Sequence, residues 1–193
     1  MLFRSLVSVR TPEEALLAAR HGADFIDLKE PGQGALGGLP EPTLRAIVAA
    51  LREAGITLPV SATIGDVPNA SLDAIRTRVE VVASCGVDYV KVGIERNAHA
   101  AAVLAWLARC GHAVVPVFIA DHGFDFAAVE QAAEAGFPGV MADTADKRAG
   151  SLFALAGEAE LRQFVATARR GGALVGLAGA LRLPDLQIGR AHV

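Results

Sequence analysis

The sequence predicts an α/β fold, a (β/α)8 TIM barrel that is truncated after the seventh strand. Seven short β-branched segments alternate with longer alanine- and leucine-rich segments of helical spacing, and glycines separate the helical segments from the strands that follow. No two strand segments lie close enough for a hairpin, so we expect parallel strands joined by helical crossovers. An open, doubly wound sheet is the alternative.

The expected strands recur every ~25–35 residues along the chain. They cover residues 2–9, 24–29, 58–65, 88–94, 112–120, 139–144 and 173–179. Thr11 is the expected N-cap of the first helix, with Pro12 in its first turn and Glu14 placed for a capping box. Ser71 and Asn97 are the expected N-caps of two later helices.

The end of the chain departs from this alternation. We expect one incomplete barrel domain over residues 1–186, because an eighth strand does not follow the seventh. Residues 187–193 ("QIGRAHV") continue neither a helical face nor a strand, and we interpret them as a non-native C-terminal artefact. A natural short tail is the alternative. Unpaired edges of an open barrel favour self-association, so a homo-oligomer is among the expected states.

The composition excludes several classes of protein. The chain is 52% hydrophobic and 20% charged, with a net charge of −3 and no basic block, so neither nucleic acid nor a membrane is an expected partner. It contains no signal-peptide pattern and no apolar run of ~18 residues. The histidines show no ligand spacing, so no metal is expected. A cytoplasmic protein with two reduced cysteines, Cys85 and Cys110, is expected.

Lysine is scarce in this chain. Only three of its 18 cationic residues are lysines: Lys29, Lys91 and Lys147. Each lies within or just after an expected strand, which is where barrel enzymes carry their chemistry. Asp27 precedes Lys29 by two residues, so both side chains face the same side of the strand, and Asp143 precedes Lys147 by four.

These lysines predict amine chemistry. A structural ion pair is the alternative for a single lysine, but the position of all three favours catalysis. Lysine, unlike arginine, can lose its proton, attack a carbonyl and form a Schiff base.

A glycine-rich loop follows the second expected strand. "GQGALG", residues 32–37, matches the dinucleotide pattern GxGxxG, but the match stands alone and "KEP" separates it from the strand. We interpret it as a flexible active-site loop. In "SATIG", Ser61 has no histidine partner for nucleophilic catalysis and is expected to hydrogen-bond substrate.

Five segments together resemble the (5-formylfuran-3-yl)methyl phosphate synthase family. They are "DFIDLKEPGQGALGG", "VSATIGDVP", "DYVKVG", "GVMADTADKRAGSLF" and "LAGALRLPDL". The resemblance implies a barrel enzyme, a carbon–oxygen lyase that condenses two molecules of glyceraldehyde 3-phosphate, a phosphorylated aldehyde, in methanofuran biosynthesis. No cofactor is implied.

The resemblance also implies roles for individual residues. Lys29 corresponds to the imine-forming lysine and Lys91 to the lysine that transfers protons, while Asp27, Asp143 and Lys147 assist with protons and phosphates. The expected substrate contacts are Ser61, Thr63, Asp66, Gly179 and Ala180. A class I aldolase-type barrel acting on another sugar phosphate and an inactive fragment that binds sugar phosphates are the alternatives.

Overall fold

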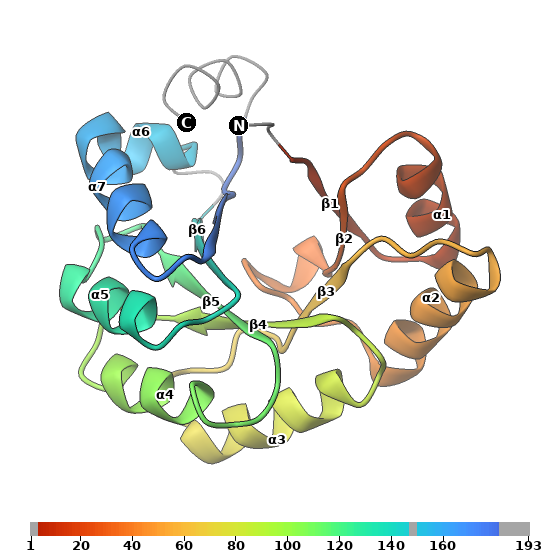
Figure 1. The fold of residues 1–193 in the computed structure, drawn as a ribbon, viewed down its shortest axis with the longest axis horizontal. Helices are drawn as coiled ribbons and strands as arrows, with labels where there is room; N and C mark the ends of the chain where they lie inside the picture. The colour runs from red at the N-terminus through yellow and green to blue at the C-terminus, as the bar shows by residue number, and fades with distance from the viewer. Residues whose placement is uncertain (1–3, 147–149, 182–193) are drawn as a thin grey trace. The chain divides into compact units, whose positions relative to one another are not determined.

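The structure is a computed structural model that describes residues 4–146 and 150–181. Figure 1 shows the ribbon of the chain. The described residues form two compact units. The N-terminal unit comprises residues 4–67 and 71–92, and the C-terminal unit comprises the described residues among 68–70 and 93–181.

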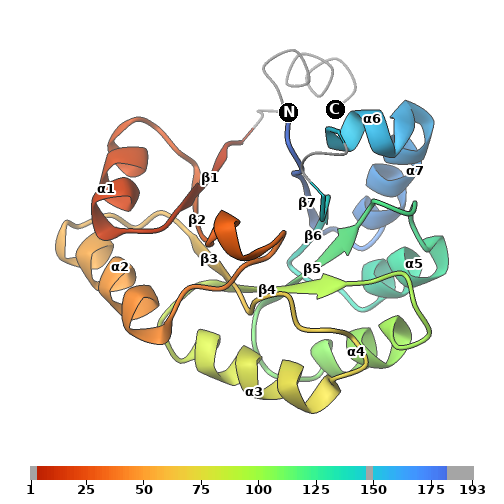
Figure 2. The ribbon, with the colours of Figure 1, turned by 180° about the vertical axis from the view of Figure 1, so that it is seen from behind.

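Parallel strands alternate with helices in the N-terminal unit. Its elements are β1 (Leu6–Val9), α1 (Pro12–Arg20), β2 (Phe25–Leu28), the 3-10 helix η1 (Pro31–Gln33), α2 (Glu41–Glu53), β3 (Val60–Thr63), α3 (Leu72–Ala83) and the first four residues of β4 (Tyr89–Ile94). The strands pair in the order β1, β2, β3, β4. Helices α1 and α2 lie on one side of these strands and η1 lies on the other (Figure 2).

Helix α2 shows why these segments become helical and pack on the strands. Leu44, Ile47, Val48 and Leu51 repeat at the spacing of one helix face, and all four are buried. Each such burial stabilises the fold by about 1.5–3 kcal/mol. The opposite face is charged, with Arg45 Nη2 2.8 Å from Glu41 Oε1.

The C-terminal unit continues the same alternation. Its elements are the end of β4, α4 (Ala100–Leu107), β5 (Val114–Ile119), α5 (Phe126–Glu134), β6 (Gly139–Asp143), α6 (Leu152–Leu155), α7 (Gly157–Arg169) and β7 (Leu174–Leu177). β6 pairs in parallel with both β5 and β7. Phe164 of α7 stacks on Phe124, with 4.6 Å between the ring centroids, and contacts Phe118 edge-on at 5.9 Å.

Most local predictions are confirmed. All seven expected strands are present, each within its predicted range, and the glycines expected to end helices have a positive φ of 71–85° at residues 22, 55, 86, 111, 136 and 172. Thr11 caps α1 by accepting a hydrogen bond from the Glu14 amide. The Glu14 carboxylate accepts from the amide of Arg10, one residue before the cap.

One predicted cap is wrong. Helix α4 begins at Ala100 with His99 as its N-cap, and not after Asn97. The Asn97 side chain instead accepts a hydrogen bond from the His99 amide, two residues along the chain. This local turn competes with helix initiation at Asn97.

The α/β fold with parallel strands is therefore confirmed. The truncated barrel stays a prediction, and so does the single-domain interpretation. The proposed artefact at residues 187–193 lies outside the described residues.

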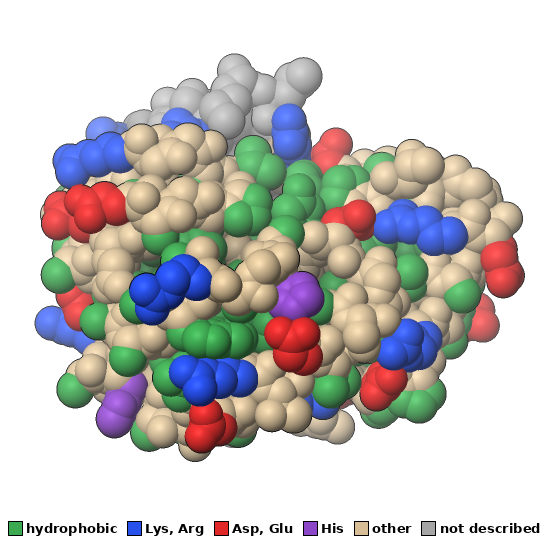
Figure 3. Space-filling view, turned by 60° about the horizontal axis from the view of Figure 1, so that its bottom comes forward, with side chains coloured by type: hydrophobic (Ala, Val, Ile, Leu, Met, Phe, Trp, Pro, Cys, Tyr) green, Lys and Arg blue, Asp and Glu red, His purple; other side chains and the backbone are tan. Residues whose placement is uncertain are grey.

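Surface charges are mixed in sign. On the face seen in Figure 3, acidic and basic side chains are interspersed. None of the described helices is long and apolar enough to cross a membrane. The cytoplasmic location stays a prediction.

Candidate active site

Three polar side chains form a row across β1, β2 and β3. The strand register places Ser8 opposite Asp27 and Asp27 opposite Ser61, so all three lie on one face of the N-terminal unit. Ser61 Oγ donates to Asp27 Oδ1 at 2.6 Å, and Ser8 Oγ donates to Asp27 Oδ2 at 3.1 Å. We call these residues the Ser–Asp–Ser row.

Lys91 binds the centre of this row. It lies on β4 opposite Thr63, two residues beyond the level of Ser61. Its Nζ lies 3.0 Å from Asp27 Oδ1 and 2.9 Å from Asp27 Oδ2. The side chains of Lys91 and Asp27 are only 2% and 1% exposed. Asp27 and Lys91, which the sequence predicts to be catalytic, therefore form a buried ion pair.

The surroundings of Asp27 keep its carboxyl group ionised. Burial raises the pKa of Asp27. The charge of Lys91, the hydrogen bonds from Ser61 and Lys91 and the charge of Lys29 all lower it, and together they outweigh the effect of burial. The net result is a pKa below the ordinary value for aspartate. Asp27 is thus suited to hold an ammonium group in place rather than to donate a proton.

Lys29 lies just beyond β2 and is 5% exposed. Its amide donates to the carbonyl of Val9 at 3.2 Å, which extends the pairing of β1 and β2 by one residue. Alternation places its side chain on the same face as Asp27, one layer further toward the carboxyl ends of the strands. The N-terminal unit thus brings Asp27, Lys29 and Lys91 together.

Hydrogen bonds connect the glycine-rich loop to other residues of the N-terminal unit. The carbonyl of Gly37 accepts hydrogen bonds from the Glu30 amide at 2.8 Å and from Thr63 Oγ1 at 3.0 Å. Asp66 Oδ1 accepts from the Leu36 amide at 3.0 Å. Gly34 has a φ of +112°, and a Cβ there would collide with the Asp66 carboxylate. The flexibility of this loop stays a prediction.

Thr63 and Asp66 are thus partners of this loop in the structure. Long-range hydrogen bonds, which no local pattern encodes, hold the loop against β3 and the residues that follow it. Their contacts with substrate stay predictions.

The remaining predicted residues lie in the C-terminal unit. Asp143 ends β6, is 1% exposed, and accepts a hydrogen bond from the Thr144 amide at 2.8 Å. Gly179 and Ala180 follow β7, with φ values of 108° and 46°. A Cβ on Gly179 would lie 2.7 Å from Thr144 Oγ1, so this close approach requires glycine. Lys147 lies outside the described residues.

The C-terminal unit also contains an open pocket of about 510 Å³. It is lined by Glu95, Arg96, Ile119, Asp121, His122, Ala145, Asp146 and Leu155. Asp121 accepts hydrogen bonds from the amides of Ala145 and Asp146 at 2.6 and 2.9 Å. The volume is in the range of small-molecule sites.

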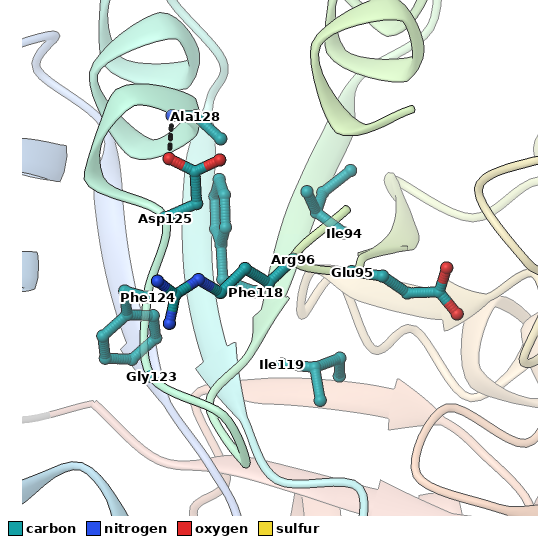
Figure 4. Close-up of a pocket in the computed structure, with 9 residues that line it drawn as sticks. All are labelled: Ile94, Glu95, Arg96, Phe118, Ile119, Gly123, Phe124, Asp125 and Ala128. Carbon is teal, nitrogen blue, oxygen red and sulfur yellow. Dashed lines mark hydrogen bonds between the residues drawn. The ribbon is translucent and has the colours of Figure 1, made fainter. Parts of the chain in front are cut away.

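A smaller pocket shares part of this wall (Figure 4). In the close-up, Arg96 extends toward Phe124 while Glu95 points the other way. Arg96 Nη1 donates to the carbonyl of His122 at 2.6 Å. Sequence reasoning assigned no role to Arg96.

Sequence reasoning also missed Ser8. The available signal was a hydroxyl between two valines in "LVSV", because alternation then places the serine on the face opposite to the valines. That signal does not reveal the partner, because Asp27 is 19 residues away and meets Ser8 only through strand pairing.

The family model and similar curated proteins point to the same family. The family model of 4-HFC-P synthase matches residues 5–191. The (5-formylfuran-3-yl)methyl phosphate synthase of Methanopyrus kandleri is 35% identical, covering 97% of this chain and 83% of the relative. A Methylorubrum extorquens protein that carries the same name provisionally is 40% identical, covering 96% of this chain and 75% of the relative.

Solved structures support the fold alone. CutC of Streptococcus agalactiae has a TM-score of 0.74 at 12% identity, covering 97% of this chain and 92% of that protein. A 2,3-dimethylmalate lyase has a TM-score of 0.55 at 13% identity, covering 97% and 80%. Such low identities carry no conclusion about activity.

Proposed function

The chain belongs to the 4-HFC-P synthase family, and on this premise we propose that it forms (5-formylfuran-3-yl)methyl phosphate from two molecules of glyceraldehyde 3-phosphate. The observation that carries the proposal is a pair of buried lysines on one face of the N-terminal unit, with the ionised Asp27 on β2, two residues before Lys29 and hydrogen-bonded to Lys91 of β4. Two amines and a carboxylate supply a nucleophile, a proton carrier and a countercharge.

The contacts of Asp27 support different roles for the two lysines. Lys91 donates to both oxygens of Asp27, which holds it as an ammonium group without the lone pair that a nucleophile needs. Lys29 is the other amine on this face of the N-terminal unit, so we assign the nucleophilic attack to Lys29.

In the proposed mechanism, the Lys29 amine attacks the aldehyde carbon of one triose phosphate. The Lys91 ammonium donates a proton to the departing oxygen, and water leaves as the imine forms. Lys91 is then a neutral amine that can remove the proton from the adjacent carbon, which gives an enamine. Asp27 remains ionised throughout and offsets the charge when Lys91 is protonated.

The enamine then attacks the aldehyde of the second triose phosphate and forms the new carbon–carbon bond. Elimination of phosphate, ring closure and release from Lys29 follow. The net reaction releases one phosphate and two waters, by cleavage of carbon–oxygen bonds, as in a lyase. We assign orientation of the phosphates and later proton transfers to Asp143, Lys147 and the turn at Gly179 and Ala180.

Borohydride trapping tests this proposal. The protein is incubated with glyceraldehyde 3-phosphate, reduced and digested, and the adduct is located by mass spectrometry. We expect the adduct on Lys29, and its loss in Lys29→Arg and Lys29→Ala. Ser71→Ala serves as the matched control, because Ser71 is exposed and its side chain makes no capping hydrogen bond to α3.

An adduct on Lys91 would reverse the two assignments. Absence of both adduct and furan product in the wild-type protein would exclude the proposed activity. A product from larger sugar phosphates, with none from triose phosphates, would favour the aldolase alternative.

A further inference from the structure

We propose that Ser8 and Ser61 are positioning residues that hold the Asp27 carboxylate ionised and in one orientation, so that Lys91 starts each catalytic cycle as an ammonium group. This inference rests on the proposed role of Lys91 as proton carrier. It replaces the expectation that Ser61 binds substrate, and it gives a role to Ser8.

The hydrogen bonds are arranged symmetrically about the carboxylate. Oδ1 accepts from Ser61 and Lys91, and Oδ2 accepts from Ser8 and Lys91. Each oxygen therefore has one hydroxyl donor and one ammonium donor. Hydrogen bonds to a charged acceptor are short and strong, and donors on both sides oppose rotation of the carboxylate. The single proton of each serine hydroxyl is used on Asp27.

The backbone fixes both serines at the level of Asp27. Each lies directly opposite Asp27 in the register of a neighbouring parallel strand, Ser8 on β1 and Ser61 on β3. Their hydroxyls therefore reach the carboxylate from opposite sides without any long or flexible side chain. Such short links lose little conformational entropy when they form their hydrogen bonds.

The two serines differ in their exposure. Ser61 is 3% exposed and its hydrogen bond is 2.6 Å long, whereas Ser8 is exposed and its bond is 3.1 Å long. A hydrogen bond is electrostatically stronger where water is excluded. We therefore expect Ser61 to contribute more than Ser8.

Two charged groups, Lys29 and Lys91, act on this carboxylate. Tyr89 is a further titratable residue on the same face, because the strand register places it opposite Ser61. Replacing serine by alanine alters the formal charge of none of them. A change in the titration of Asp27 would thus report the lost hydroxyl.

Steady-state kinetics across pH is the first test. For Ser61→Ala we expect kcat to fall, KM at neutral pH to stay within about twofold, and the acid limb of kcat to move up by about one pH unit. That shift is tenfold in the ionisation constant, as expected for one hydrogen bond to a charged group. Ser8→Ala should give a smaller shift, and Ser61→Thr should restore the profile.

The opposite division of effects would overturn the proposal. If KM rose severalfold in Ser61→Ala while the acid limb stayed in place, Ser61 would be a substrate ligand. An unchanged acid limb in both alanine variants would likewise exclude a positioning role. Ser71→Ala, which changes an exposed serine of the same unit, should match the wild type in both parameters.

A second measurement needs no turnover and so separates this inference from the proposed function. The ¹³Cγ resonance of Asp27, assigned by its absence in Asp27→Asn, is compared at a series of pH values within the folded range. We expect the resonance of Ser61→Ala to move toward that of a protonated carboxyl at a higher pH than in wild type. Superimposable resonances in the two proteins would overturn the proposal, even in a protein that showed no furan synthesis.

Discussion

At the scale of single residues, the central feature is a buried ion pair. Asp27 and Lys91 are almost fully excluded from solvent, with 2.9 Å between Lys91 Nζ and Asp27 Oδ2. Removing both charges from water costs several kcal/mol, and mutual attraction offsets that cost only while both partners are present. The pair therefore makes each partner depend on the other.

Asp27→Asn is expected to destabilise the fold by ~3–5 kcal/mol, because it leaves the Lys91 ammonium buried without a countercharge. The double variant Asp27→Asn/Lys91→Met should recover most of this loss and remain inactive. The free energy of unfolding of the single and the double variant is measured by urea denaturation. A double variant less stable than Asp27→Asn alone would contradict this account.

At the scale of elements, aromatic packing joins α7 to the strand and loop it covers. Phe164 lies on α7 and is fully buried, while Phe118 belongs to β5 and Phe124 to the segment before α5. These contacts close the apolar layer of the C-terminal unit. They depend on the shape of one side chain, since interiors are packed as densely as organic crystals.

Phe164→Ala is expected to lower the free energy of unfolding by ~3–5 kcal/mol, because it removes a buried ring and leaves a cavity. Phe164→Leu should cost less, since it retains much of the apolar volume. Leu17→Ala provides the control, because Leu17 is 59% exposed and such surface changes alter stability by only ~0.5 kcal/mol. Equal losses for Phe164→Ala and Leu17→Ala in thermal or urea unfolding would refute this packing argument.

The elements also show what the sequence could predict. Strands, helix ends and the Thr11 cap follow from periodicity and from glycine, and each depends on residues within a few positions. The same local reasoning placed Asp27, Lys29 and Lys91 on one face. It could not identify the serine hydroxyls that donate to Asp27 or the link between Asp66 and Leu36, because these contacts join residues 19 to 34 positions apart.

At the scale of the whole molecule, family and fold are separate conclusions. Relatives of 31–40% identity carry the name of one enzyme, whereas solved structures near 12% identity share only the fold. The assignment of chemistry therefore depends on the Ser–Asp–Ser row and the lysines, because one fold serves many activities.

Whole-molecule stability should depend on pH through Asp27. Its pKa is lower in the folded state than in the unfolded state, so the unfolded chain takes up the proton more readily. The resulting stability is present at neutral pH and is lost as pH falls through the folded value. When urea unfolding is measured from pH 7 downward, the free energy of unfolding should fall less steeply for Asp27→Asn/Lys91→Met than for wild type. The same slope in both would exclude Asp27 as the source, and Asp73→Asn, at an exposed position, should follow the wild type.

The Ser–Asp–Ser row has a consequence for how this chain can change in evolution. Its members face one another only because three strands keep a common register, and successive residues of a strand face opposite sides. Inserting or deleting a single residue inside β1, β2 or β3 would turn one member toward the helices. Changes of length should therefore accumulate in the helices and in the turns before each strand, while the strand interiors evolve by substitution alone.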